Sequence, residues 1–299
     1  MPRKAHLDGL AIALLLGCCL VWGFQQVLAK ATIPEVAPIF QAALRVVGAT
    51  VLLFVWCRVR RIPLFASDGS LGAGLLAGAL FTAEFGLIFS ALASSSASRA
   101  TLLLYTSPFW VACVLPLIVK SERLRPAQWL GLLLAFAAVA FVLQDSATSV
   151  ASGRSQWHGD LLALAAGLSW GLTTVAIRAT RLMEVSAEKL LFYQLGVGAI
   201  ALPVLSLVLG ETWNWHWSAF AQVSLALQTV VGAFASYLVW MWMLGRYPAT
   251  HISSFVFFTP VFAMLFGALW LKEAVTPNLL AGMALVAAGM VLVNRRPAA

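Results

Sequence analysis

The feature that most constrains this chain is the repetition of apolar stretches, each about as long as a membrane-spanning helix. A helix needs ~20 mainly apolar residues to cross the hydrocarbon core of a bilayer. Lipid offers no partners to backbone polar groups, so such stretches cross as helices that satisfy these groups internally. The sequence therefore predicts an all-α polytopic membrane protein of ten transmembrane helices, at residues 8–29, 36–57, 70–93, 98–119, 127–144, 159–179, 187–209, 217–244, 249–271 and 278–294.

The composition supports this fold class and excludes a large soluble domain. Hydrophobic residues make up 62% of the 299 residues and charged residues only 10%, whereas soluble domains carry about 25% charged residues. The formal net charge of +8 would suggest nucleic acid as the partner of a soluble protein. Here the charges fall between apolar stretches, so we expect them to face water and lipid headgroups, with no nucleic acid bound.

The first apolar stretch resembles a secretory signal peptide, since Arg3 and Lys4 precede it and Ala29-Lys30-Ala31 resembles a cleavage site. Its length exceeds the 7–15 residues of a usual signal-peptide core. A similar segment also recurs in mid-chain. We therefore predict that it is the first transmembrane helix.

The distribution of Lys and Arg predicts the orientation in the membrane. With the N-terminus on the cytoplasmic side, most of the 19 Lys and Arg residues fall in cytoplasmic segments, and only Lys30, Arg99, Arg154 and Lys272 fall on the other side. Cytoplasmic loops carry an excess of these residues. We expect both termini to be cytoplasmic, in the inner (plasma) membrane of the cell.

Short motifs recur at a nearly constant spacing. Trp22-Gly23 matches Trp170-Gly171 at 148 residues, and Thr106-Ser107-Pro108 matches Phe258-Thr259-Pro260 at 152 residues. The chain thus divides into two halves of five helices, 1–146 and 147–299. An odd number of spans in each half means that the second half enters the membrane from the opposite side. Inverted repeats of this kind are typical of secondary transporters.

These motifs resemble the drug/metabolite transporter superfamily, in its ten-helix EamA-type branch. The resemblance rests on Trp22-Gly23, on Ser169-Trp170-Gly171 and on Arg45. It also rests on the run from Ala100 to Pro108 leading to Glu122-Arg123-Leu124 and Pro126, and on its second copy, Ser253 to Pro260 with Lys272-Glu273 and Pro277. After Trp-Gly the family often has a small polar residue, where this chain has Phe24-Gln25-Gln26.

The resemblance implies a secondary transporter that exports small metabolites across the inner membrane by alternating access. Among its relatives the chain looks most similar to aromatic amino acid exporters, because of its tryptophan content and overall pattern. Amino acids, aromatic ones included, are the expected substrates, and lipophilic cations or drugs are the alternative. The expected partners are a small-molecule substrate and membrane lipid, with no cofactor, no metal and no obligatory protein partner.

Two ionisable residues lie in the middle of predicted spans, where such residues are costly and usually functional. Glu84 is predicted to bind a substrate ammonium group or a transported proton. Arg45 is predicted to have a gating or structural role. The alternative for both is an Arg45–Glu84 ion pair that only offsets the cost of burial.

Aromatic and hydroxyl side chains occupy matched positions in the two halves. They can line a substrate cavity, since ligand pockets are mostly apolar with a few placed polar groups, or they can simply be core packing. The predicted substrate-binding residues, together with Glu84, are Gln25, Phe81, Phe85, Tyr105, Ser107, Trp170, Ser236, Tyr237, Trp240, Phe257 and Thr259.

Two prolines, Pro108 and Pro260, fall at matched positions inside the fourth and ninth spans. Proline removes a backbone hydrogen bond and kinks a helix. The two residues are predicted to be gating hinges or static kinks that shape the cavity.

The main rival class is a membrane enzyme. The chain has no His-Glu-x-x-His or Gly-x-Ser-x-Gly motif, and no paired aspartates within spans, so no nucleophile–base or metal arrangement is evident. Its four cysteines all lie in apolar runs, without a metal-ligand spacing. A phosphate-binding Gly-x-x-x-x-Gly-Lys loop is also missing, so ATP-driven transport by this chain is excluded and a gradient must supply the energy.

Overall fold

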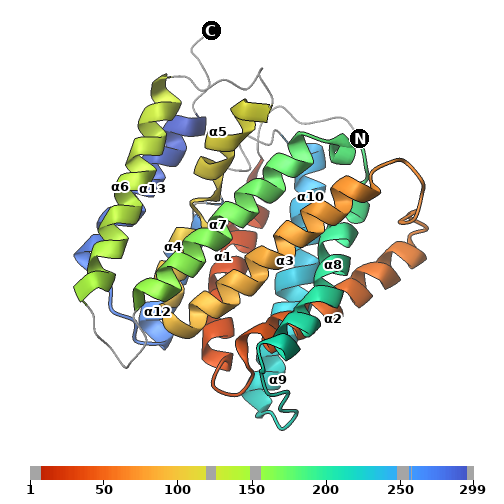
Figure 1. The fold of residues 1–299 in the computed structure, drawn as a ribbon, viewed down its shortest axis with the longest axis horizontal. Helices are drawn as coiled ribbons and strands as arrows, with labels where there is room; N and C mark the ends of the chain where they lie inside the picture. The colour runs from red at the N-terminus through yellow and green to blue at the C-terminus, as the bar shows by residue number, and fades with distance from the viewer. Residues whose placement is uncertain (1–7, 119–125, 149–155, 248–255, 257, 295–299) are drawn as a thin grey trace.

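The ten predicted spans are present as apolar helical segments. The computed structural model describes residues 8–118, 126–148, 156–247, 256 and 258–294, and within them it contains helices and no strands. Seven of the helical spans are at least 18 residues long, and shorter apolar helices complete the set. The all-α polytopic fold is therefore confirmed (Figure 1).

The first half contains α1 (Gly9–Thr32), α2 (Pro38–Val59), α3 (Leu71–Ser94), α4 (Ala97–Leu104), α5 (Ser107–Ile118) and α6 (Pro126–Thr148). The second half contains α7 (Gln156–Arg178), the short η1 (Arg181–Met183), α8 (Ala187–Val208), α9 (Ala219–Ala226), the π-helical stretch η2 (Leu227–Ala235), α10 (Ser236–Arg246), α12 (Phe258–Trp270) and α13 (Pro277–Asn294). Helices α2, α6 and α13 begin at a proline, where the missing N–H costs no hydrogen bond.

Two spans are not the single α-helices that the sequence predicts. The fourth is interrupted at Tyr105 and Thr106, between α4 and α5. Pro108 has no N–H to donate to the carbonyl of Leu104, four residues earlier, which explains the break. The eighth span is continuous but changes from α9 through the π-helical η2 to α10.

The two halves run in opposite directions through the molecule. Helix α1 begins at the end where Tyr247 donates a hydrogen bond to Asp8, which we call the near end. Helix α7 begins at the other end, where Ser95 donates to Asp160, which we call the far end. The inverted arrangement of the halves follows from these contacts.

The packing of the helices follows the pseudo-symmetry between the two inverted halves. Helix α2 packs on α8, its counterpart, and α6 packs on α13, its counterpart (Figure 1). Helix α3 packs on α7, while α9, η2 and α10 of the second half pack on α1. Helix α1 also packs on α12, as α7 packs on α4 and α5. These contacts between the halves are thus repeated when the halves are exchanged.

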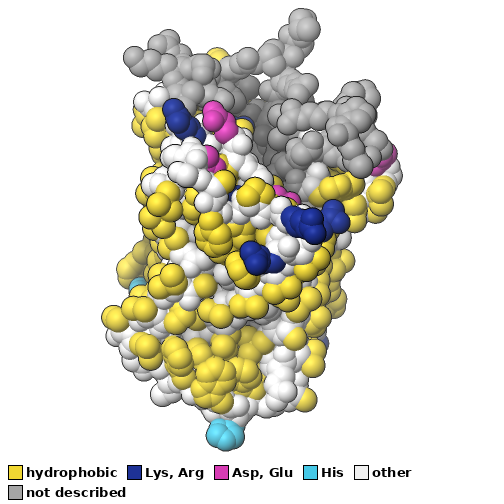
Figure 2. Space-filling view, turned by 90° about the vertical axis from the view of Figure 1, so that its right-hand side faces the viewer, with side chains coloured by type: hydrophobic (Ala, Val, Ile, Leu, Met, Phe, Trp, Pro, Cys, Tyr) yellow, Lys and Arg dark blue, Asp and Glu magenta, His cyan; other side chains and the backbone are white. Residues whose placement is uncertain are grey.

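The outer surface carries the apolar residues expected of a lipid-facing protein. Large hydrophobic side chains are exposed along the spans, for example Val51, Leu76, Ile200 and Val204. Figure 2 shows a broad apolar band on one face, with the visible Lys and Arg side chains gathered toward the near end. An exposed apolar surface of this extent marks contact with a membrane or a partner.

The contact between α3 and α8 depends on Gly78. A Cβ atom at this position would lie 2.6 Å from the carbonyl oxygen of Tyr193 and 2.6 Å from a methyl group of Val197. Close approach of this kind is typical of small residues between membrane helices. Gly196, on the partner helix α8, has no neighbouring atom within 4 Å of such a Cβ.

We predict that Gly78→Ala destabilises the protein by about 1–3 kcal/mol, the usual cost of overpacking. Gly196→Ala is the matched control and should be neutral or stabilising by up to about 1 kcal/mol, since alanine favours a helix over glycine. Thermal unfolding of the purified variants in detergent measures both effects. Equal melting temperatures for the two variants would contradict the α3–α8 packing.

Candidate functional site

The Trp-Gly motif of each half is explained by close packing against the opposite half. A Cβ at Gly23 would lie 2.8 Å from the carbonyl oxygen of Thr259. A Cβ at Gly171 would lie 3.0 Å from the carbonyl oxygen of Ser107, the residue that corresponds to Thr259 in the repeat. Each glycine lets the first helix of its half approach the matching span, and the preceding tryptophan is placed at the interface between the halves.

Trp22 joins α1 to α10 in the interior. Its Nε1 donates to Oγ of Ser236 at 2.8 Å, and Oγ of Ser236 donates to the carbonyl of Gly232 at 2.7 Å. The Trp22 ring lies 5.1 Å from that of Trp240 and 6.0 Å from that of Tyr237. The predicted residues Ser236, Tyr237 and Trp240 are thus brought together around Trp22, which was missing from the predicted set.

Arg45 and Glu84 lie beside this aromatic group, on α2 and α3. Arg45 is 2% exposed and Glu84 is 8% exposed. The guanidinium of Arg45 lies 4.9 Å from the ring centre of Phe85 and interacts electrostatically with Tyr237 and Glu84. We call Trp22, Arg45, Glu84, Ser236, Tyr237 and Trp240 the central cluster.

Arg45 and Glu84 do not form the direct ion pair that the alternative interpretation requires. In the part of the chain that the structure describes, the ion pairs within 4 Å are Arg99–Asp160 and Lys189–Asp68. Nε and Nη2 of Arg45 have no hydrogen-bond partner among the described residues. Buried polar groups are nearly always paired in folded proteins, so these two donors are unusual.

Other buried acceptors lie on the same helices. Oε1 of Gln25, of Gln41 and of Gln228 has no partner among the described residues. Gln25 is a predicted site residue, and its Oε1 lies against Gly232 in η2. Gln41 and Gln228 were not predicted. Gln41 precedes Arg45 by one helical turn, so the i, i+4 spacing on α2 is a signal that could have identified it.

The remaining predicted residues, which come from both halves, are less polar. The ring of Tyr105 lies 5.1 Å from that of Trp170, edge to face. Tyr105, Ser107 and Thr259 are buried, and Tyr105 interacts with Thr259. Phe81 and Phe85 are buried on α3 with ring centres 4.5 Å apart. Phe257 lies outside the described residues.

Both prolines stand near the start of a helix. Pro108 is the second residue of α5 and follows the break in the fourth span, and Pro260 is the third residue of α12. These positions place them next to Ser107 and Thr259 on the interface between the halves. Their role as hinges stays a prediction.

The far end is held by a dense polar network. Arg99 donates to Oδ2 of Asp160 from Nε at 3.2 Å and from Nη2 at 2.6 Å, and Ser95 donates to Oδ1 of the same carboxylate. Glu273 accepts from the backbone N–H of Ala97 at 2.6 Å and of Ser98 at 3.1 Å. This acid satisfies the first N–H groups of α4, where negative charge is favourable.

Further acids at the far end perform the same task for other helices. Glu211 accepts from the N–H groups of Ile39 and Phe40 at the start of α2. Glu35 accepts from N and Oγ of Ser218, which precedes α9, and these hydrogen bonds lower the pKa of its carboxyl group. The carboxylates of this end therefore tie the halves together.

The near end carries a related but smaller set of contacts. Tyr247 corresponds to Ser95 at a spacing of 152 residues, and it donates to Asp8 just before α1, as Ser95 donates to Asp160 near the start of α7. Lys189 donates to Asp68 at 2.7 Å, and this hydrogen bond lowers the pKa of the Asp68 carboxyl group. None of the end residues was predicted as a site residue from the sequence.

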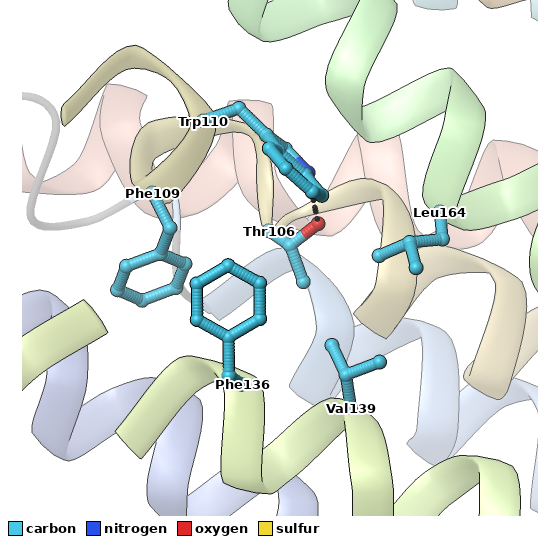
Figure 3. A pocket seen from close by; sticks show the side chains of 6 residues that line it. All are labelled: Thr106, Phe109, Trp110, Phe136, Val139 and Leu164. Atoms are coloured by element: carbon cyan, nitrogen blue, oxygen red, sulfur yellow. Dashed lines mark hydrogen bonds between the residues drawn. The ribbon is translucent and has the colours of Figure 1, made fainter. Parts of the chain in front are cut away.

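One small pocket lies away from the central cluster, between α5, α6 and α7 (Figure 3), and its accessible volume is about 10 Å³. Thr106 is its polar residue and accepts from Nε1 of Trp110 at 3.3 Å. The other lining residues are apolar, and Phe136 is 47% exposed at the surface. This volume is far below the ~300 Å³ of typical ligand sites, so we do not assign the substrate to it. The described residues hold no group of three His, Cys, Asp or Glu that could bind a metal.

The fold and these contacts define a polytopic membrane protein made of two inverted, homologous halves around a buried polar and aromatic centre. The model of the EamA-like transporter family matches residues 9–144 and 157–295, one match to each half. The chain belongs to this family.

Curated relatives cover nearly the whole chain. An "Uncharacterized transporter YoaV" of Bacillus subtilis is 24% identical, over 92% of this chain and 94% of its own. A "Probable amino-acid metabolite efflux pump" of Escherichia coli is 26% identical, over 97% of this chain and 94% of its own. A protein of known crystal structure shares the fold, with a TM-score of 0.65, 20% identity and 94% of both chains covered.

We predict that Asp160→Asn destabilises the protein by about 3–5 kcal/mol, because it breaks the buried ion pair between Asp160 and Arg99. Asp68→Asn is the matched control at the other end. Its side chain is 39% exposed, so water screens the pair with Lys189, and the buried Lys189 ammonium keeps its hydrogen bond to the carbonyl of Ala66. The loss should therefore be smaller. Melting temperatures of both variants in detergent provide the measurement. A larger loss of stability for Asp68→Asn than for Asp160→Asn would contradict the conclusion that the Arg99–Asp160 pair stabilises the far end.

Proposed function

We propose that this chain exports small metabolites by alternating access, with amino acids, aromatic ones included, as its substrates. The observation that carries the proposal is the central cluster, where charged, hydroxyl and aromatic side chains are buried together between two inverted halves. Substrate sites of such transporters lie near the membrane midplane at the repeat interface. The name of the Escherichia coli relative supports amino-acid substrates.

In this mechanism the two ends open in turn around the central cluster. The far end opens when contacts such as Arg99–Asp160 and Glu273 with the start of α4 separate. The near end opens when contacts such as Tyr247–Asp8 separate. Both sets join the first half to the second, so rocking of one half against the other breaks one set while it keeps the other.

Export of lipophilic cations is the second candidate. The Glu84 carboxylate and the rings of Trp22 and Trp240 are groups that attract a cation. Arg45 opposes it, since its positive charge lies close to the same groups. On this proposal the chain is no enzyme, uses a substrate or proton gradient as its energy source, and acts on a small molecule without nucleic acid or an obligatory protein partner.

The test is uptake into liposomes that contain the purified protein. Labelled phenylalanine and tryptophan should enter faster than into protein-free liposomes, and sugars should not. Trp22→Phe should slow uptake several-fold, because it removes the hydrogen bond to Ser236, and ~1 kcal/mol corresponds to roughly fivefold. Trp157→Phe changes an exposed tryptophan and should leave the rate unchanged. Uptake of lipophilic cations with no amino-acid uptake would favour the second candidate.

The orientation is a separate part of the proposal: the near end faces the cytoplasm of a cell whose inner membrane holds the protein. Arg60 is exposed at the near end and Asn214 at the far end. With Cys113 replaced by serine, Asn214→Cys should react with an impermeant thiol reagent in intact spheroplasts, and Arg60→Cys should react only after lysis. The remaining native cysteines are buried and serve as an internal control. The reverse labelling pattern would invert the orientation.

A further inference from the structure

We propose that Arg45 and Glu84 together recognise a zwitterion, with the Arg45 guanidinium on the substrate carboxylate and the Glu84 carboxylate on its ammonium group. This inference rests on the proposed function and specifies how the substrate is selected. It assigns the unpaired donors of the central cluster to the ligand rather than to the protein.

The two Arg45 nitrogen atoms without hydrogen-bond partners are the pair that can donate together to one carboxylate. Nε–H and Nη2–H point from the same edge of a guanidinium, and this edge matches the two oxygens of a carboxylate. Both atoms of Arg45 lack a partner among the described residues. In Arg99 the same two atoms donate to Asp160. This edge of the guanidinium therefore binds a carboxylate in Arg99, and in Arg45 it is available for one.

The surroundings hold Arg45 in place without using that edge. Its guanidinium lies 4.9 Å from the ring centre of Phe85 and 5.9 Å from that of Phe89, distances at which a cation is attracted by the ring. The charge is 98% buried by this packing, whereas an unpaired buried cation is strongly unfavourable. A bound carboxylate removes that penalty, and the gain is part of the binding energy.

Glu84 supplies the opposite charge without accepting a hydrogen bond from Nε or Nη2 of Arg45. It interacts electrostatically with Arg45, but the two groups are not within ion-pair distance in the described structure. A zwitterion that spans them brings one charge to each. An amine without a carboxylate leaves Arg45 unpaired, and a carboxylate without an amine leaves Glu84 unpaired, so both are disfavoured.

The position of Arg45 suits a site that must face each side in turn. Phe85 and Tyr237 occupy equivalent positions in the two halves, at a spacing of 152 residues. Arg45 packs on the first and interacts with the second, so its guanidinium lies between the halves. The ring of Trp22 contacts those of Tyr237 and Trp240 across the interface, and these rings can receive an apolar or aromatic substrate side chain.

The experiment uses three matched probes: L-phenylalanine, 2-phenylethylamine, which lacks the carboxylate, and 3-phenylpropanoate, which lacks the amine. Each competes with labelled phenylalanine for uptake into liposomes that contain the full-length protein. In the wild type, each incomplete probe should compete at least tenfold more weakly than phenylalanine, because a missing partner leaves a buried group unpaired.

Arg45→Lys keeps the charge and removes the two-donor edge. It should weaken the binding of phenylalanine at least tenfold and reduce the ratio by which phenylalanine competes better than 2-phenylethylamine. Glu84→Gln should reduce the ratio by which phenylalanine competes better than 3-phenylpropanoate. Arg58→Gln changes an exposed arginine on the same helix and should alter neither ratio. A purely structural role would change all three probes equally. Should Arg45→Lys fail to fold, the wild-type probe series and Glu84→Gln still decide the matter.

The outcomes separate this inference from the proposed function. Amino-acid uptake in which phenylalanine and 2-phenylethylamine compete equally, or in which Arg45→Lys leaves their ratio unchanged, overturns the zwitterion site and leaves the exporter intact. No uptake of any amino acid by the wild type overturns both. The crossed effect of the two variants on the two incomplete probes supports the site.

Discussion

The contact on which the rest of the structure depends is the close approach of the first helix of each half to a span of the opposite half. It occurs at the glycine of each Trp-Gly pair. Gly23 lies against Thr259 and Ala263, and Gly171 lies against Ser107 and Trp110. Without a side chain at these positions the helices approach until backbone and Cβ atoms touch, which is how membrane helices gain packing energy when no hydrophobic effect acts between them. The tryptophan before each glycine is then fixed at the centre, where Trp22 meets Ser236 and Trp170 meets Tyr105.

Polar groups are distributed unevenly between the ends and the centre. At the far end the carboxylates of Glu35, Asp160, Glu211 and Glu273 are satisfied by helix N-termini, serines or Arg99. At the centre, Arg45 and Gln25 keep atoms without partners among the described residues. Satisfied networks rigidify a structure, and unsatisfied buried groups are costly. The free energy gained at the ends therefore offsets the cost of the unsatisfied polar groups at the centre.

Much of the fold could be predicted from the sequence, because the length and apolarity of each helix are properties of a single continuous segment. Such local features predicted the ten spans, the repeat, and the prolines that start α2, α6 and α13.

The site could be predicted only in part. Ser236 and Trp240 were found by helical spacing, and Trp22 could have been added as the counterpart of Trp170. The contacts Arg99–Asp160 and Tyr247–Asp8 could not, because they join segments far apart in the chain, and no local pattern specifies which carboxylate meets which donor. The break before α5 was only partly predicted, since Pro108 indicated a kink but not the interruption at Tyr105 and Thr106.

The two halves share a backbone plan but have diverged in the side chains that matter at the centre. Ser236 and Glu84 occupy equivalent positions, yet Ser236 is bound to Trp22 while Glu84 has no direct ion-pair partner in the described structure. Tyr237 and Phe85 are likewise equivalent, and Arg45 lies between them. A symmetric centre would present the same groups to both halves and could not fix the direction of a substrate with two unlike ends. On the proposed mechanism either end can open, and the charge asymmetry gives the proposed site one polarity. The divergence of Glu84 from Ser236 is then the step that would convert a symmetric passage into a selective one.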